Sequence, residues 1–155
     1  MSLLRQFVMA LSVLLVEDSD HKRIKVNELI NEIPGEVKLV EAQSFNSGSR
    51  ALDQTEFDVV IIDMSLPTFD RSPTESGGRF RALGGRELAR KIVRKGLSSR
   101  IIFFTQYDSF SGTNAHTLKT LGELLAQECG DNFVALIHYD SSVSTWREQL
   151  TAALK

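Results

Sequence analysis

The stretch Val59-Val-Ile-Ile-Asp63-Met-Ser-Leu-Pro67 carries four branched aliphatic residues that run directly into an aspartate. A run of this kind, without polar alternation, is typical of a strand that is buried on both faces of a sheet. Similar apolar runs recur along the chain, at residues 11–16, 37–40, 57–62, 101–104 and 133–137. We therefore predict five buried strands.

Segments with helical periodicity separate these runs. The first places Val26, Leu29, Ile30 and Ile33 on one face, and the same spacing occurs around residues 88–93, 118–125 and 143–154, with a weaker helix at 47–54. Strands that alternate with helices imply right-handed crossovers and a parallel sheet covered on both faces. The prediction is an α/β, flavodoxin-like doubly wound (βα)5 fold with strand order 2-1-3-4-5. Residues 71–84 and 107–114 are predicted as long loops after strands three and four.

Length and composition bound the class of protein. The 155 residues predict a single domain over 1–155, with residues 1–3 interpreted as a remnant of an expression vector. The apolar run near the N-terminus is about ten residues long, too short for the roughly 20 that a membrane helix needs. Cys129 is the single cysteine and has no partner for an internal disulfide. We predict a cytoplasmic protein that does not enter a membrane.

Charge is concentrated in one segment although the formal net charge is only -2. Residues 71–100 contain nine basic and two acidic side chains. Two interpretations stay open. The segment is a docking surface for an acidic partner or a nucleic acid, or a steering patch for an anionic phosphodonor; or it is a solvated loop with weak surface ion pairs. The acidic chain as a whole, and the scarcity of aromatic residues in the basic segment, argue against nucleic-acid binding.

Acidic and hydroxyl side chains follow the predicted strands at their carboxyl ends. Glu17 and Asp18 follow the first strand, Asp63 the third and Thr105 the fourth. In a doubly wound sheet these ends meet at the switch point where ligands bind. Three carboxylates at one point repel each other unless a cation neutralises them, and oxygen ligands of this kind suit Mg²⁺. Asp63 is then placed to accept a phosphoryl group.

An alternative interpretation is that polar residues after strands are loop residues or helix caps, with Ser19 or Asp20 as caps of the first helix. For any one residue this is the more frequent case. The agreement of three positions on one site favours the functional interpretation.

Three stretches together resemble the response-regulator receiver family. They are Val13-Leu-Leu-Val-Glu-Asp-Ser-Asp20, Val59-Val-Ile-Ile-Asp63-Met-Ser-Leu-Pro67 and Ile101-Ile-Phe-Phe-Thr105. The resemblance extends over nearly the whole chain, with the basic segment placed as an insertion after strand three. It implies a phosphorelay switch of two-component signalling, not an enzyme.

The resemblance also assigns roles. It implies that Asp63 is the phosphoacceptor and that Thr105 binds the phosphoryl group as the switch hydroxyl. It implies a Mg²⁺ site formed by Glu17, Asp18, Asp63 and the backbone carbonyl of Ser65. The implied partners are a histidine kinase or phosphotransfer protein and a downstream effector protein, with a homodimer left open.

Two features depart from that family. Its members carry a lysine at the end of strand five, whereas here no Lys or Arg occurs between Lys119 and Arg147, and the position falls near His138 or Tyr139. Without that cation we expect the phosphorylated state to lose a charge-assisted contact of about 1.5–3 kcal/mol. Gln106 is bulkier than the residue usual after the hydroxyl.

These departures leave other functions open. The main alternative is a pseudo-receiver, which binds proteins without being phosphorylated. A protonated His138 could instead supply the positive charge of the missing lysine, which is the weaker alternative. An aspartate-nucleophile phosphohydrolase is disfavoured because Ser65 stands where a second aspartate is expected. A flavin-binding role is disfavoured because no phosphate-cradling loop follows the first strand.

Overall fold

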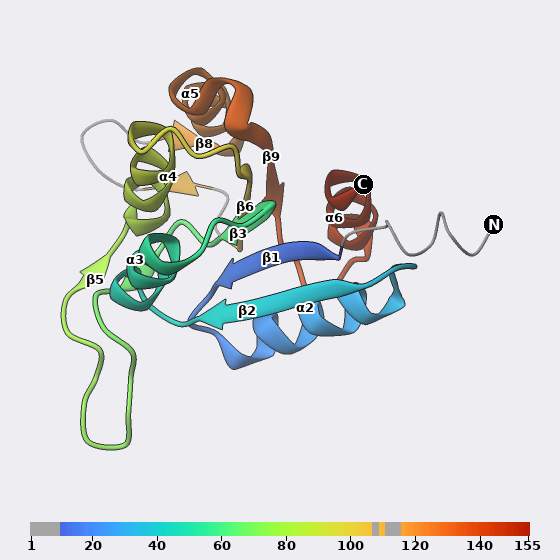
Figure 1. Ribbon diagram of the computed structural model, residues 1–155. Coiled ribbons are helices and arrows are strands. Elements are labelled where there is room, and N and C mark those ends of the chain that lie inside the picture. The colour runs from blue at the N-terminus through green and yellow to red at the C-terminus, as the bar shows by residue number, and fades with distance from the viewer. Residues whose placement is uncertain (1–9, 107–108, 111–115) are drawn as a thin grey trace.

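A five-stranded parallel sheet forms the centre of the molecule in the computed structural model, which describes residues 10–106, 109–110 and 116–155. Its order is β2-β1-β3-β6-β9, which confirms the predicted order 2-1-3-4-5 (Figure 1). The strands are β1 (Leu11–Val16), β2 (Val37–Ala42), β3 (Val59–Ile62), β6 (Arg100–Thr105) and β9 (Phe133–His138).

Helices cover both faces of this sheet because neighbouring residues of each strand point to opposite sides. Leu14 packs with the layer of α3, α4 and α5, whereas Leu15 packs with the layer of α2 and α6. The helices are α2 (Asp20–Glu32), α3 (Phe45–Gln54), α4 (Gly84–Arg94), α5 (Leu118–Cys129), the 3₁₀ turn η1 (Gly130–Asn132) and α6 (Thr145–Leu154). Val143, predicted on the last apolar stripe, precedes α6 and is exposed, so that part of the prediction is wrong.

The basic segment at residues 71–100 is not one loop. Strands β4 (Leu66–Pro67) and β5 (Phe80–Arg81) pair in antiparallel fashion and close a hairpin that projects from the sheet (Figure 1). Most of the remaining basic residues lie on α4, which begins at Gly84. In the second predicted loop, β7 (Ser109–Phe110) pairs with β8 (His116–Thr117), and residues 107–108 and 111–115 lie outside the described residues.

Capping side chains fix where the helices around the site begin. The Ser19 hydroxyl accepts a hydrogen bond from the backbone N–H of Lys22, which confirms Ser19 as the N-cap of α2. Ser44 and Ser47 form a capping box at the start of α3. Because α2 begins so soon after β1, its first turn stands directly beside the carboxyl end of the sheet.

Among the described residues, no helix is both long and apolar enough to cross a bilayer. The single-domain boundary at residues 1–155 stays a prediction, and residues 1–3 lie outside the described residues.

Candidate functional site

Three carboxylates meet at the carboxyl end of the sheet, as the sequence predicted. Glu17 and Asp18 follow β1, Asp63 follows β3, and one oxygen of each side chain lies within 4.8 Å of the others. The backbone N–H of Asp63 donates to the carbonyl of Val16, so the two strand ends are tied together directly above the sheet. This geometry comes from the parallel register of β1 and β3, in which Val16 pairs with Ile62.

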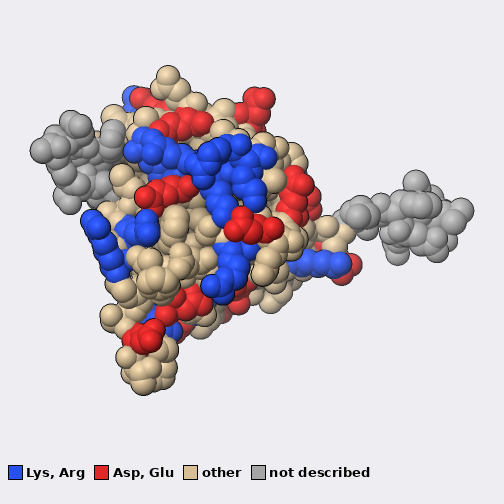
Figure 2. All heavy atoms as spheres, turned by 60° about the vertical axis from the view of Figure 1, so that its left-hand side comes forward, with Lys and Arg blue, Asp and Glu red and all other residues tan. Residues whose placement is uncertain are grey.

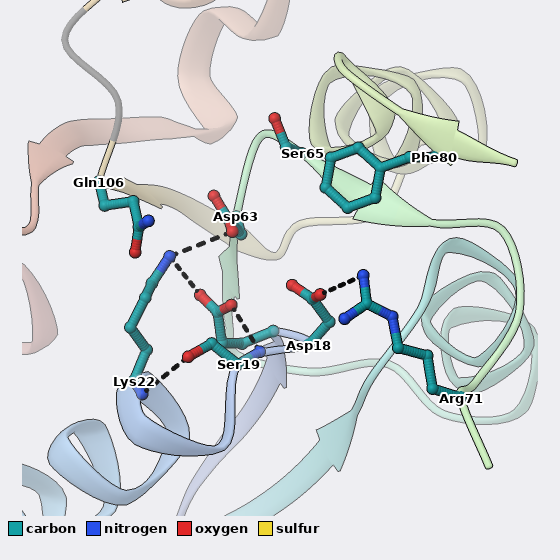
Figure 3. A pocket seen from close by; sticks show the side chains of 9 residues that line it. Asp18, Ser19, Lys22, Asp63, Ser65, Arg71, Phe80 and Gln106 are labelled. Atoms are coloured by element: carbon teal, nitrogen blue, oxygen red, sulfur yellow. Dashed lines mark hydrogen bonds and ion pairs between the residues drawn. The ribbon is translucent and has the colours of Figure 1, made fainter. Parts of the chain in front are cut away.

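The carboxylates line a pocket of about 230 Å³ that Figure 3 shows from close by. Its walls come from β1, the start of α2, the loop after β3, the β4–β5 hairpin and the end of β6. The lining residues are Glu17, Asp18, Ser19, Lys22, Asp63, Ser65, Arg71, Phe80 and Gln106.

Lys22 reaches into the pocket from the first turn of α2. Its Nζ lies 2.7 Å from Glu17 Oε1 and 3.1 Å from Asp63 Oδ2, and the side chain is 2% exposed (Figure 3). The chain thus supplies a buried ammonium at the site from α2, whereas the expected loss of the contact from the end of strand five stays a prediction. A signal was present in the sequence: Lys22 lies four residues before Val26 and so falls on the apolar face of its helix.

Burial controls the ionisation of this cluster. Burial, reinforced by the charge of Asp63, raises the pKa of Glu17 to about 8, against the opposing effect of Lys22. Burial also raises the pKa of Asp63, again opposed by Lys22. Burial alone lowers the pKa of Lys22, but the two carboxylates outweigh it and the pKa stays above its ordinary value. The ammonium therefore holds its charge between the two acids.

The donor set fits a hard divalent cation. Carboxylate oxygens from three residues converge, and Mg²⁺ binds through few protein carboxylates while it keeps part of its water. Asp63 Oδ1 is buried without a hydrogen-bond partner in the described part of the chain, which leaves an oxygen free for a ligand. A divalent cation bound here offsets the repulsion from Asp63 that helps to raise the pKa of Glu17, so cation binding is electrostatically favoured.

The β4–β5 hairpin adds a second cation at the mouth of the pocket. Arg71 Nη2 lies 3.3 Å from Asp18 Oδ2, with Arg71 half exposed and Asp18 largely shielded (Figure 3). Phe80 lines the same side. The sequence predicted a loop after strand three but not the contact between Arg71 and an acidic residue of the site.

The remaining predicted residues take different positions. Thr105 ends β6 and is fully buried, next to but not within the described lining of the pocket. Ser65 lines the pocket, and its hydroxyl donates to the carbonyl of Ala82 at 3.1 Å. Gln106 also lines it. The His138 ring nitrogen Nε2 lies 3.0 Å from the Gln106 carbonyl oxygen, so His138 is engaged outside the acidic cluster.

Tyr139 directly follows β9, and the position of the family lysine was expected near His138 or Tyr139. Its backbone N–H donates to the carbonyl of Thr105, and its ring is buried against Phe104 and Trp146. Its hydroxyl lies 2.9 Å from His21 Nε2. This strand end therefore contributes an aromatic side chain to the core.

Gly85 fixes the position of Asp63 from the side of α4. A Cβ at Gly85 would lie 2.2 Å from the carbonyl oxygen of Asp63 and 3.0 Å from Met64 Cα. The Gly85 N–H donates to the Met64 carbonyl at 2.9 Å. Only glycine lets the start of α4 approach the loop after β3 this closely.

Basic side chains gather over the face of the molecule that carries α4 (Figure 2). Several are paired: Arg86 and Arg90 contact Glu128 on α5, and Lys91 and Lys95 contact Asp53 on α3. These pairs stabilise the packing of neighbouring helices, in line with the surface-pair interpretation of the basic segment.

The solved structures that this chain resembles are receiver domains. A two-component response regulator of the LuxR family from Aurantimonas sp. SI85-9A1 superposes with a TM-score of 0.63 at 23% identity, over 94% of this chain and 86% of that one. The strand order and this likeness are those of the receiver fold, and the acidic cluster lies at the carboxyl end of its sheet.

Two curated relatives extend the comparison. The Detocs response regulatory protein DtcB of Enterobacter cloacae is 25% identical over 146 residues, which cover 90% of this chain and 95% of that protein. The DtcB protein of Vibrio alginolyticus is 28% identical over 92% of this chain and 99% of that protein. No protein-family model matches the sequence.

Proposed function

We propose that this receiver domain is a phosphoacceptor switch, in which Asp63 takes a phosphoryl group from a histidine kinase or a phosphotransfer protein. The observation that carries the proposal is the convergence of Glu17, Asp18 and Asp63 in one pocket. The response-regulator class of the relatives supports it.

The residues of the pocket have separate tasks in this proposal. Glu17, Asp18, Asp63 and the backbone carbonyl of Ser65 hold Mg²⁺, which when bound offsets the negative charge of the transferring phosphoryl group. The Asp63 carboxylate is the nucleophile. The Thr105 hydroxyl, at the end of the adjacent strand, binds a phosphoryl oxygen and so registers that Asp63 is modified.

Output in this proposal is a shift between two conformations of the domain. Thr105 precedes the segment that leads to α5 and pairs with β9, so its movement biases the face formed by α5 and β9. That face binds a downstream effector protein or a second copy of the chain. Phosphodonors of this type are cytoplasmic, and we place the protein there.

Phosphate uptake tests the proposal. The purified protein is incubated with acetyl phosphate and Mg²⁺, and the intact mass is measured beside Asp63→Asn and Asp131→Asn. Asp131 lies on η1, before β9 and thus at the opposite end of the sheet. We expect one phosphoryl group on the parent protein and on Asp131→Asn, and none on Asp63→Asn. A folded parent protein that gains no mass from acetyl phosphate or from a phosphohistidine donor would refute the proposal.

A pseudo-receiver is the second candidate, and one observation favours it. Lys22 already bridges Glu17 and Asp63, and Arg71 already contacts Asp18, so side chains of the protein partly neutralise the pocket. In that case the domain binds its partner without phosphorylation. The same mass measurement separates the two candidates.

A further inference from the structure

We propose that Lys22 is the cation that stabilises the phosphoryl group on Asp63, so that the charge required by the transfer comes from helix α2 and not from the end of β9. This inference rests on the proposed phosphoacceptor function and identifies a further catalytic residue for it. The observation behind it is the contact between Lys22 Nζ and the Asp63 carboxylate.

The geometry places the ammonium beside the reacting group. Nζ lies 3.1 Å from Asp63 Oδ2 and 2.7 Å from Glu17 Oε1, and it stands 5.6 Å from the centre of the Phe104 ring. The Lys22 side chain is 2% exposed. The ammonium is thus held in a site shielded from water, where a charge-assisted contact is strong.

The charge balance of the pocket requires such a cation when the phosphoryl group arrives. A phosphorylated side chain carries close to two negative charges, about one more than the carboxylate it replaces. Arg71 is the other cation that lines the described part of the pocket, but it is half exposed and contacts Asp18. Lys22 is the one already bound to Asp63, and a small rotation brings its ammonium to a phosphoryl oxygen.

The end of β9 is not available for this task. Tyr139 packs between Phe104 and Trp146, with ring centres 5.3 and 5.2 Å away. Its hydroxyl is engaged with His21, the residue directly before Lys22. The aromatic side chain at the strand end therefore supports the first turn of α2, which in turn positions the ammonium.

The transfer step balances without a further reagent. With an acyl phosphate as donor, a carboxylate oxygen of Asp63 forms a bond to phosphorus while the bond from phosphorus to the acyl oxygen breaks, and the electron pair leaves with the carboxylate product. With a phosphohistidine donor the phosphorus–nitrogen bond breaks, and the released ring nitrogen takes a proton from water. Lys22 stays protonated throughout and stabilises the added charge.

The test compares Lys22→Met, which keeps the length of the side chain, with Lys22→Arg and with the matched control Lys25→Met. Lys25 lies on the same helix, is 40% exposed and pairs with Glu28. Two quantities are measured: the rate at which acetyl phosphate and Mg²⁺ add phosphate, from intact mass, and the Mg²⁺ affinity, from the fluorescence of Trp146. Trp146 is the only tryptophan of the chain and packs on Phe104.

We expect Lys22→Met to lose at least about tenfold in phosphorylation rate, because one charge-assisted contact is removed. Its Mg²⁺ affinity is expected not to fall, since the pocket has lost a positive charge; a merely structural role would lower both. Lys22→Arg should retain part of the rate, and Lys25→Met should match the parent. A parent-like rate in folded Lys22→Met overturns the role of Lys22 while phosphoacceptor function stands. A parent protein that takes no phosphate overturns both.

If Lys22→Met does not fold, the comparison moves to a charge-balanced background. Glu17→Gln removes one carboxylate, and Glu17→Gln/Lys22→Met removes the opposing ammonium with it. A phosphorylation rate at least tenfold lower in the double variant than in Glu17→Gln supports the inference. Because Glu17 is also a proposed Mg²⁺ ligand, both variants are measured at saturating Mg²⁺, and equal rates above the Asp63→Asn background overturn the inference.

Discussion

A methyl group added at Gly85 tests whether α4 holds Asp63 in place. In Gly85→Ala the new Cβ would lie 2.2 Å from the Asp63 carbonyl oxygen and 3.0 Å from Met64 Cα, both backbone atoms. Because backbone cannot rotate away, either α4 or the loop after β3 must move. Overpacking of this kind costs about 1–3 kcal/mol, and for a chain of this length each kcal/mol lowers the melting temperature by roughly 2–4 °C.

Gly122→Ala is the matched control, because Gly122 also lies in a helix but its Cβ would meet only Leu136, at 3.7 Å. There the substitution should stabilise the protein by about 0.5–1 kcal/mol, since alanine favours the helix. Urea unfolding, followed by tryptophan fluorescence, measures the free energy of unfolding of both variants. Labelling of the folded variants with acetyl phosphate measures how much Asp63 is phosphorylated. Gly85→Ala should lose stability and phosphorylation together. Equal stability of the two variants, or full labelling of Gly85→Ala, would refute the reasoning.

Two further predictions concern surface charges. Arg71→Ala should tighten Mg²⁺ binding about 1.5- to 5-fold, because the ion pair between Arg71 and Asp18, worth about 0.2–1 kcal/mol, no longer competes with the metal. A Mg²⁺ titration at low salt measures this affinity. An unchanged or weaker affinity contradicts the prediction. The hydrogen bond from Arg86, with help from Arg90, lowers the pKa of Glu128 to about 2. A carboxylate whose pKa is lowered in the folded protein stabilises the fold only while it is ionised. At neutral pH the unfolding free energy of the parent should therefore exceed that of Glu128→Gln by about 1 kcal/mol, after allowance for solvent screening. That difference should shrink as the pH falls from about 4.5 toward 2, and a difference independent of pH would count against the ion pair.

The fold follows closely from local sequence pattern. The run ending at Ile62 and the other apolar runs predicted the five strands of the sheet to within two residues at each end. Parallel strands with helical crossovers admit few arrangements, so the strand order followed as well. Helix ends were less accurate, as Val143 shows, because a stripe of apolar residues does not reveal which residue is the cap.

The acidic cluster was also determined by sequence alone. Glu17, Asp18 and Asp63 each directly follow a buried strand, and strands of one parallel sheet end at the same edge. Once the fold is known, the meeting of these three carboxylates follows. The residues that set the charge of the pocket needed the tertiary structure. Lys22 reaches Asp63 across 41 residues of sequence, and Arg71 reaches Asp18 from a hairpin.

The physical reason is the difference between backbone direction and side-chain reach. Hydrophobic periodicity tells where a strand or helix runs, and thereby where a short carboxylate at its end must lie. A long, flexible side chain such as that of Lys22 can extend into solvent or fold over apolar neighbours. The sequence pattern does not predict which of the two occurs. The packing of α2 against the sheet decides it, since it buries the Lys22 side chain with the ammonium facing Glu17 and Asp63, 5.6 Å from the centre of the Phe104 ring.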